Sequence, residues 1–123
     1  MILVVDDEPL ARQIAAAVLS NDGYEVREAV SADEAFKTLS LQPEAFRLLL
    51  TDVQMPGQTG IELAKLLVER KIVIPTVFMS GSRPELPKDE LQKIGCAFLS
   101  KPFRPNELLD VVRLCLEQEP VRK

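Results

Sequence analysis

The sequence has 123 residues, which gives room for one domain, and its 46% hydrophobic content is enough for a buried core. The net charge of −4 argues against a nucleic-acid surface, which needs clustered Lys and Arg. No window approaches the ~20 apolar residues of a membrane span. Because the sequence contains no histidine, imidazole bases and histidine metal ligands are excluded. Any chemistry here must use carboxylates, hydroxyls, lysine or a metal.

The chain alternates short apolar runs with segments of helical periodicity. In chain order the pattern predicts strand 2–5, helix 9–20, strand 24–29, helix 31–41, strand 47–51, helix 60–70, strand 74–80, a short helix 88–94, strand 96–100 and helix 105–118. Pro9 suits a first helical turn, and Gly23 is placed to end that helix in a left-handed conformation. The segments 31-SADE-34 and 59-TGIE-62 predict two capping boxes.

Five repeats of strand and helix predict an α/β fold, with a parallel sheet, right-handed crossovers and helices on both faces. Residues 1–123 show no internal linker or repeat, and we expect a single domain. The apolar start at 2–5 is too short for a signal peptide and is followed directly by Asp6. Cys96 and Cys115 lie in apolar surroundings and are interpreted as buried thiols, with a disulfide or metal site as the alternative. A cytoplasmic location is expected, in keeping with the interpretation of the two cysteines as reduced thiols.

Polar side chains follow four of the five predicted strands. They are Asp6 and Asp7 after the first strand, Asp52 after the third, Ser80 at the end of the fourth and Lys101 after the fifth. Ligands of such sheets bind beyond the carboxyl ends of the strands, so these side chains are the candidate site. Taken singly, each acid or hydroxyl could equally be a helix cap or turn residue, and the lysine a solvated charge.

Together the set points to a metal and to phosphoryl chemistry. Three neighbouring acids repel one another, and Lys101 compensates only one of them, which leaves about two negative charges for a divalent cation. Carboxylate sites of this kind suit Mg2+. An aspartate can act as a nucleophile and form an aspartyl phosphate. We interpret Asp52 as that nucleophile, because Asp6 and Asp7 are adjacent and can share the metal.

Four segments resemble the receiver domain of two-component response regulators. They are 2-ILVVDDEP-9, 50-LTDVQMPGQTG-60, 77-VFMSG-81 and 98-FLSKPF-103, and they occur in the order and at about the spacing of that family. The resemblance covers the whole chain. It implies a flavodoxin-like, doubly wound sheet of five parallel strands in the order 2-1-3-4-5.

The resemblance also implies roles for single residues. Asp52 would accept a phosphoryl group from a partner's phosphohistidine, and Mg2+ (Mn2+ can substitute) would bind Asp6, Asp7, Asp52 and the backbone carbonyl of Gln54. Lys101 would bind a phosphoryl oxygen, Ser80 and Phe98 would be the switch residues, and Pro102 would follow a cis peptide bond. The surface near the fourth helix, fifth strand and last helix would change on phosphorylation.

The implied partners are a sensor histidine kinase or histidine phosphotransfer protein, and a downstream effector domain or protein. No direct nucleic-acid or membrane contact is expected, and a phosphorylation-dependent homodimer stays open. So does the choice between a stand-alone regulator and a receiver from a hybrid kinase or a longer regulator.

Two features depart from the family. Pro84 and Pro87 predict a short fourth helix, and Arg104 stands where a helix cap is usual. The rival interpretations are a phosphohydrolase of the haloacid dehalogenase type and a degenerate receiver that serves only as a scaffold. The first wants Asp-x-Asp after its first strand, where this chain has 6-DDE-8, and the intact acid, hydroxyl and lysine set argues against the second. We therefore expect a signalling domain that takes part in its own phosphorylation and is not a turnover enzyme.

Overall fold

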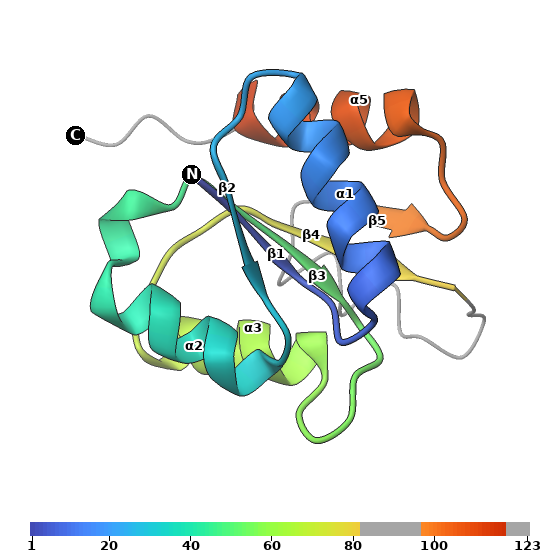
Figure 1. The fold of residues 1–123 in the computed structure, drawn as a ribbon. Coiled ribbons are helices and arrows are strands. Elements are labelled where there is room, and N and C mark those ends of the chain that lie inside the picture. Colours follow the sequence, from blue (N-terminus) through green and yellow to red (C-terminus); the bar gives the residue numbers. More distant parts are fainter. Residues whose placement is uncertain (82–96, 118–123) are drawn as a thin grey trace.

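A five-stranded parallel sheet forms the centre of the molecule (Figure 1). The computed structural model describes residues 1–81 and 97–117. The strands are β1 (Ile2–Val5), β2 (Val26–Ala29), β3 (Leu48–Asp52), β4 (Thr76–Ser80) and β5 (Ala97–Ser100). Their order is β2-β1-β3-β4-β5, and every neighbouring pair is parallel, as the resemblance implied. This is the doubly wound, flavodoxin-like arrangement.

Helices cover both faces of this sheet. Helices α1 (Pro9–Asn21) and α5 (Pro105–Glu117) lie on one face, and α2 (Ala32–Leu41) and α3 (Gly60–Glu69) lie on the other (Figure 1). A single 3-10 turn, Pro43–Ala45, connects α2 to β3. The predicted short helix 88–94 and Cys96 lie outside the described residues.

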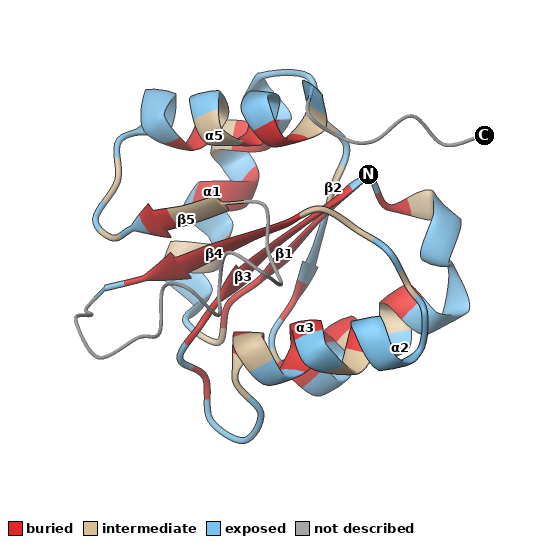
Figure 2. Cartoon of the chain, turned by 180° about the vertical axis from the view of Figure 1, so that it is seen from behind, coloured by how far each residue is buried: buried red, intermediate tan, exposed pale blue. Residues whose placement is uncertain are grey.

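The three central strands, β1, β3 and β4, are buried between two apolar layers and are red in Figure 2. Strand residues alternate between the layers: Val4 and Leu50 pack toward α1 and α5, while Leu3 and Leu49 pack toward α2 and α3. Because both faces are covered, β1, β3 and β4 are buried at every position. Cys115 is buried on the α1 and α5 side, as predicted.

The second strand begins later than predicted, at Val26 and not at residue 24. Gly23 has φ +97° and ends α1 as expected. The N–H of Tyr24 donates to the carbonyl of Leu19, and that of Gly23 donates to Ser20. These two hydrogen bonds close the end of the helix, so Tyr24 belongs to the helix cap and not to the strand ladder.

The helix starts were predicted correctly in part. Thr59 and Glu62 form the expected capping box of α3. At α2, Ser31 accepts the N–H of Glu34 as expected, but the Glu34 carboxylate accepts the N–H of Val30 and not that of Ser31, so this box was only half right.

At α5, Arg104 supplies no side-chain cap in the described contacts, but its N–H donates to the carboxylate of Glu107 at 2.7 Å. The start of α5 is therefore stabilised from within the helix, by an acidic residue that also complements the helix dipole.

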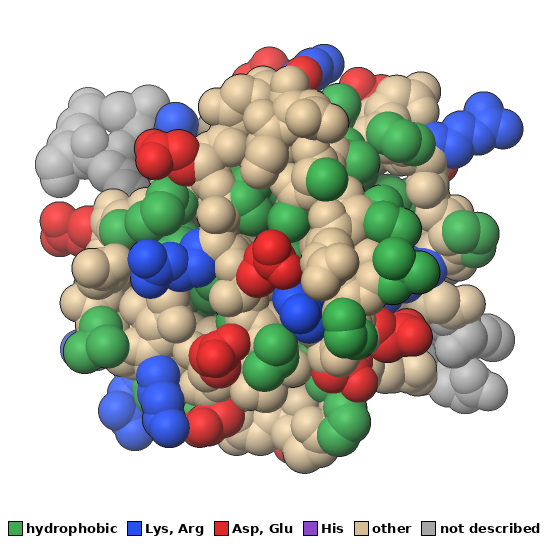
Figure 3. Space-filling model, in the orientation of Figure 1, with side chains coloured by type: hydrophobic (Ala, Val, Ile, Leu, Met, Phe, Trp, Pro, Cys, Tyr) green, Lys and Arg blue, Asp and Glu red, His purple; other side chains and the backbone are tan. Residues whose placement is uncertain are grey.

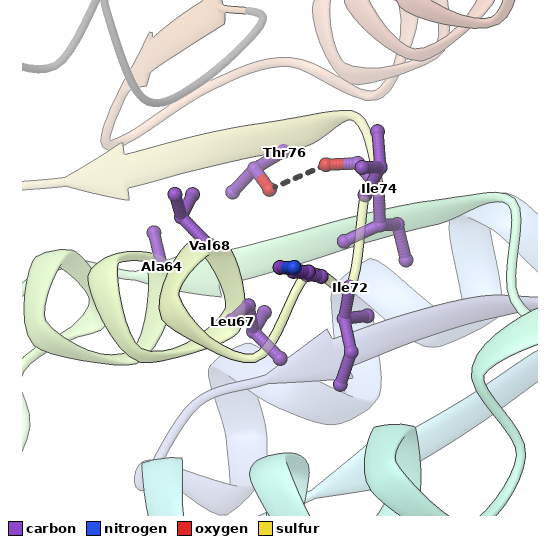
Figure 4. A pocket seen from close by; sticks show the side chains of 8 residues that line it. Ala64, Leu67, Val68, Ile72, Ile74 and Thr76 are labelled. Atoms are coloured by element: carbon purple, nitrogen blue, oxygen red, sulfur yellow. Dashed lines mark hydrogen bonds between the residues drawn. The ribbon is translucent and has the colours of Figure 1, made fainter.

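One further feature lies away from the carboxyl ends of the strands. An apolar cavity of about 150 Å³ lies between α3 and the start of β4, lined by residues such as Leu67, Ile72 and Ile74 (Figure 4). Its lining contains a single charged residue, Lys71, so it offers no cluster of reactive groups.

No helix of the described residues has both the length and the apolar character needed to cross a membrane.

Candidate functional site

The parallel register brings the predicted site residues to one edge of the sheet. Val5 pairs with Thr51, so Asp6 and Asp52 follow at the same level on neighbouring strands. Asp52 is the last residue of β3 and not the first residue after it, and it pairs with Met79 of β4. At β5, Ser80 pairs with Ser100, which places Lys101 directly beyond the strand end.

Three carboxylates meet at this edge. One carboxylate oxygen from each of Asp6, Asp7 and Asp52 lies within 4.8 Å of the other two. Asp6 is 1% exposed and Asp52 is 8% exposed, whereas Asp7 is the accessible member of the group. Three hard oxygen donors at this spacing, two of them buried, fit the ligand preference of Mg2+.

Lys101 bridges two of these acids. Its Nζ lies 2.8 Å from Oδ2 of Asp6 and 3.3 Å from Oδ2 of Asp52. Its shorter contact is therefore with Asp6 and not with Asp52. The lysine is thus the counter-charge within the cluster. Its single positive charge leaves about two negative charges of the three carboxylates uncompensated.

Burial and the neighbouring charges shift the pKa of Asp52 and that of Lys101. Burial raises the pKa of Asp52, the positive charge of Lys101 opposes this rise, and the charge of Asp6 adds to it, so the pKa lies above its ordinary value. Burial lowers the pKa of Lys101, but its hydrogen bond to Asp6 and the charge of Asp52 outweigh burial and raise it overall. Lys101 therefore stays charged at neutral pH, beside a carboxylate that is costly to keep ionised.

The other predicted residues lie around this cluster. The N–H of Gln54 donates to Oδ1 of Asp52 at 3.3 Å, while the metal contact of its carbonyl stays a prediction. Ser80 is 2% exposed, and its carbonyl accepts the N–H of Lys101 at 2.8 Å. Phe98 pairs with Phe78 and packs against a cluster that contains Val53, the residue after Asp52. The peptide bond between Lys101 and Pro102 is cis, as the resemblance implied.

Two residues that sequence reasoning did not single out contribute to this geometry. Gly60 donates its N–H to the carbonyl of Val53, and a Cβ at this position would overlap the main-chain oxygen of Asp52. A glycine at the first position of a capped helix was the available signal. Arg12 donates from Nη1 to the carbonyl of Asp6, and no pattern in the sequence separated it from an ordinary surface arginine.

An apolar hollow adjoins the acids. It has a volume of about 390 Å³, and its lining includes Asp6, Lys101, Ile14 of α1 and Phe103 of the loop before α5. Ile14 is 52% exposed beside it.

On the face drawn in Figure 3, the described basic side chains lie scattered among acidic ones and form no continuous basic area.

Known proteins share both the sequence pattern and the fold. The chain is 34% identical over 116 residues to the positive alginate biosynthesis regulatory protein of Pseudomonas aeruginosa, covering 91% of this chain and 45% of that protein. It is 33% identical over 121 residues to the phosphate regulon transcriptional regulatory protein PhoB of the same organism, covering 95% and 52%. The receiver domain of NtrX from Brucella abortus matches with a TM-score of 0.87 and 31% identity, covering 97% of this chain and 100% of that one.

The chain spans about half the length of these two curated relatives, so it corresponds to one part of each. The family model of the response regulator receiver domain matches residues 2–113. With this match over most of its length, the chain belongs to the response regulator receiver domain family, the signalling domain of two-component systems.

Proposed function

We propose that residues 1–123 form a single receiver domain in which Asp52 accepts a phosphoryl group from a phosphohistidine on a sensor histidine kinase or a histidine phosphotransfer protein. The observation that carries this proposal is the position of Asp52. It lies at the end of a central strand, with carboxylate oxygens of Asp6 and Asp7 within 4.8 Å and Lys101 at 3.3 Å.

In the proposed transfer, a carboxylate oxygen of Asp52 attacks the phosphorus atom. The bond between phosphorus and the imidazole nitrogen breaks, and its electron pair stays on the leaving nitrogen. Lys101 supplies positive charge for the phosphoryl oxygens from its place between the two acids. Asp6, Asp7, Asp52 and the carbonyl of Gln54 would hold Mg2+ or Mn2+. When bound, the ion supplies further neutralisation of charge on the phosphoryl oxygens.

The proposal also includes a switch. The side chain of Ser80 moves toward the new phosphoryl group, and its hydroxyl donates a hydrogen bond to that group. The side chain of Phe98 then moves into the space that Ser80 has vacated. The surface near β5, the last helix and the predicted helix 88–94 then changes, and an effector domain or protein reads that surface. The half-buried position of Phe98 against the cluster that contains Val53 supports this role.

Several partner and location assignments rest on family membership. We place the domain in the cytoplasm with its kinase, without direct contact to nucleic acid or membrane. The names of the two Pseudomonas relatives are those of regulators, which supports an effector downstream of this domain. The apolar hollow beside Asp6 and Lys101 gives a protein phosphodonor a contact surface next to the acceptor.

Intact mass measurement tests the proposal. The protein is incubated with acetyl phosphate or phosphoramidate and Mg2+, and we expect a gain of one phosphoryl group. Asp52→Ala and EDTA should each abolish the gain, while Asp110→Ala, which removes an exposed acid of α5, should leave it unchanged. Repeated release of phosphate from varied esters would indicate a phosphohydrolase instead, and no mass gain from any donor would leave only a scaffold role.

A further inference from the structure

Arg12 of α1 contacts the main chain at the candidate site. Its side chain is only 12% exposed. Nη1 donates to the carbonyl of Asp6 at 3.0 Å, and Nε donates to Oε1 of Glu28 on β2 at 2.9 Å. The guanidinium group therefore joins three elements: the end of β1, the first turns of α1 and the edge strand β2.

The carbonyl of Asp6 belongs to the peptide group between the first two acids. A peptide group is planar and rigid, so the direction of this carbonyl fixes the direction in which the chain enters Asp7. The other polar groups of Asp6 are also held: its N–H donates to Ala29, Oδ1 accepts from the N–H of Glu8, and Oδ2 accepts from Lys101. Among the described residues, Arg12 is the one that contacts the carbonyl of this peptide group.

Asp7 depends on this plane more than the other acids do. Its carboxylate has no hydrogen-bond or ion-pair partner within residues 1–81 and 97–117, and it is the accessible member of the cluster. Asp6 and Asp52 are held by Lys101, but no described residue holds the side chain of Asp7 in a comparable way. Its place within 4.8 Å of the other two carboxylates therefore comes from the backbone.

We propose that Arg12 is a positioning residue for the acid cluster, acting through the Asp6 carbonyl to hold Asp7 where it can share a cation with Asp6 and Asp52. This inference rests on the proposed function, since it assumes that the cluster binds Mg2+. Glu28 supports the arrangement by fixing the rotation of the guanidinium group. At 41% exposure its ion pair with Arg12 contributes little stability of its own.

Two other roles for Arg12 make different predictions. If Arg12 acted only as a nearby positive charge, its removal would strengthen binding of a cation. If it only stabilised the fold, its removal would lower the melting temperature but leave the Mg2+ affinity of the folded protein unchanged. A positioning role predicts weaker binding by the folded protein, because residues that orient metal ligands typically change affinity by about 10- to 100-fold when removed.

The experiment measures Mg2+ affinity by calorimetric titration of the full chain, at a temperature where circular dichroism shows each variant fully folded. We expect Arg12→Met to weaken binding about tenfold. Arg12→Lys, which keeps the charge but loses the two-pronged donor, and Glu28→Ala should weaken binding by less. Arg113→Met is the matched control, because Arg113 makes a comparable ion pair with Asp22 at the far end of α1. It should bind Mg2+ as the wild type does.

Several results of these titrations would overturn the positioning role of Arg12. Equal or tighter binding by Arg12→Met overturns the proposal, and so does an equal loss in Arg113→Met. If Arg12→Met does not fold, wild-type affinity in both Arg12→Lys and Glu28→Ala overturns it. A wild type that binds no Mg2+ overturns the proposed function and this inference together, whereas binding by the wild type with no effect of Arg12 overturns the inference alone.

Discussion

Asp52 is a buried carboxylate whose charge is only partly compensated. Lys101 lies 3.3 Å from it but is closer to Asp6, at 2.8 Å, so one cation serves two acids. Burial and the repulsion of Asp6 outweigh the attraction of Lys101 and raise the pKa of Asp52. A residue of this kind is a poor choice for stability alone, and perturbed acids in a cluster are typical of functional sites.

The raised pKa predicts how stability changes with pH when no metal is present. The folded protein binds the Asp52 proton more tightly than the unfolded chain, where the carboxyl has a pKa near 3.8. The free energy of unfolding therefore falls as pH rises from the unfolded pKa through the folded pKa. Asp52→Asn removes this loss, so in EDTA the variant should be more stable than the wild type at neutral pH, and the difference should shrink in acid.

Urea unfolding at a series of pH values measures this difference. Asp110→Asn is the control, because Asp110 is an exposed acid on α5 with only a 3.9 Å ion pair to Arg113. It should change stability little and with no comparable trend. If Asp52→Asn is less stable than the wild type at neutral pH, the prediction is wrong. Burial and the repulsion of Asp6 would then not outweigh the attraction of Lys101 at Asp52.

At the scale of the elements, the sequence predicted most of the sheet and the gathering of the site. Apolar runs that end in Asp, Ser or Lys located the strand ends, and parallel pairing then brought Asp6, Asp52 and Lys101 together. The sequence did not predict contacts that depend on how far a side chain reaches. These are the shorter contact of Lys101 with Asp6, the hydrogen bond of Arg12 to the Asp6 carbonyl and the hydrogen bond by which Glu107 caps α5. Such contacts depend on three-dimensional distance and leave no periodic pattern.

The junction of β3 and α3 gives a prediction at this scale. Gly60→Ala places a methyl group against the main-chain oxygen of Asp52, which is backbone and cannot move away as a flexible side chain would. We expect a loss of about 1–3 kcal/mol in unfolding free energy, the usual cost of overpacking. Gly81→Ala is the control at the same edge of the sheet, since its new Cβ would meet Lys101 only at 3.9 Å.

Chemical denaturation of the two variants compares these sites directly. The control should change stability by less than about 0.5 kcal/mol, as exposed substitutions usually do. If both variants lose the same unfolding free energy, the loss comes from replacing glycine in general. The close approach of α3 to the main chain of Asp52 would then not be its cause.

At the scale of the whole molecule, folding itself assembles the acid cluster. Asp6 and Asp52 are separated by a strand, two helices and a 3-10 turn, yet they lie level because β1 and β3 pair in parallel. The unfolded chain has no such arrangement of carboxylates. A cation that binds the cluster must therefore favour the folded state, and the stability of the domain becomes a measure of the site.

Mg2+ should raise the melting temperature of the protein, whether or not a phosphodonor is present. At a Mg2+ concentration ten times the dissociation constant, binding adds about 1.4 kcal/mol, which corresponds to roughly 5 °C for a domain of this size. Asp7→Asn is the decisive comparison, because Asp7 is accessible and its side chain has no partner among the described residues. Its loss should leave the metal-free melting temperature nearly unchanged while removing most of the increase with Mg2+. An increase of equal size in Asp7→Asn would place the cation elsewhere, and no increase in the wild type would count against a metal site at the ends of β1 and β3.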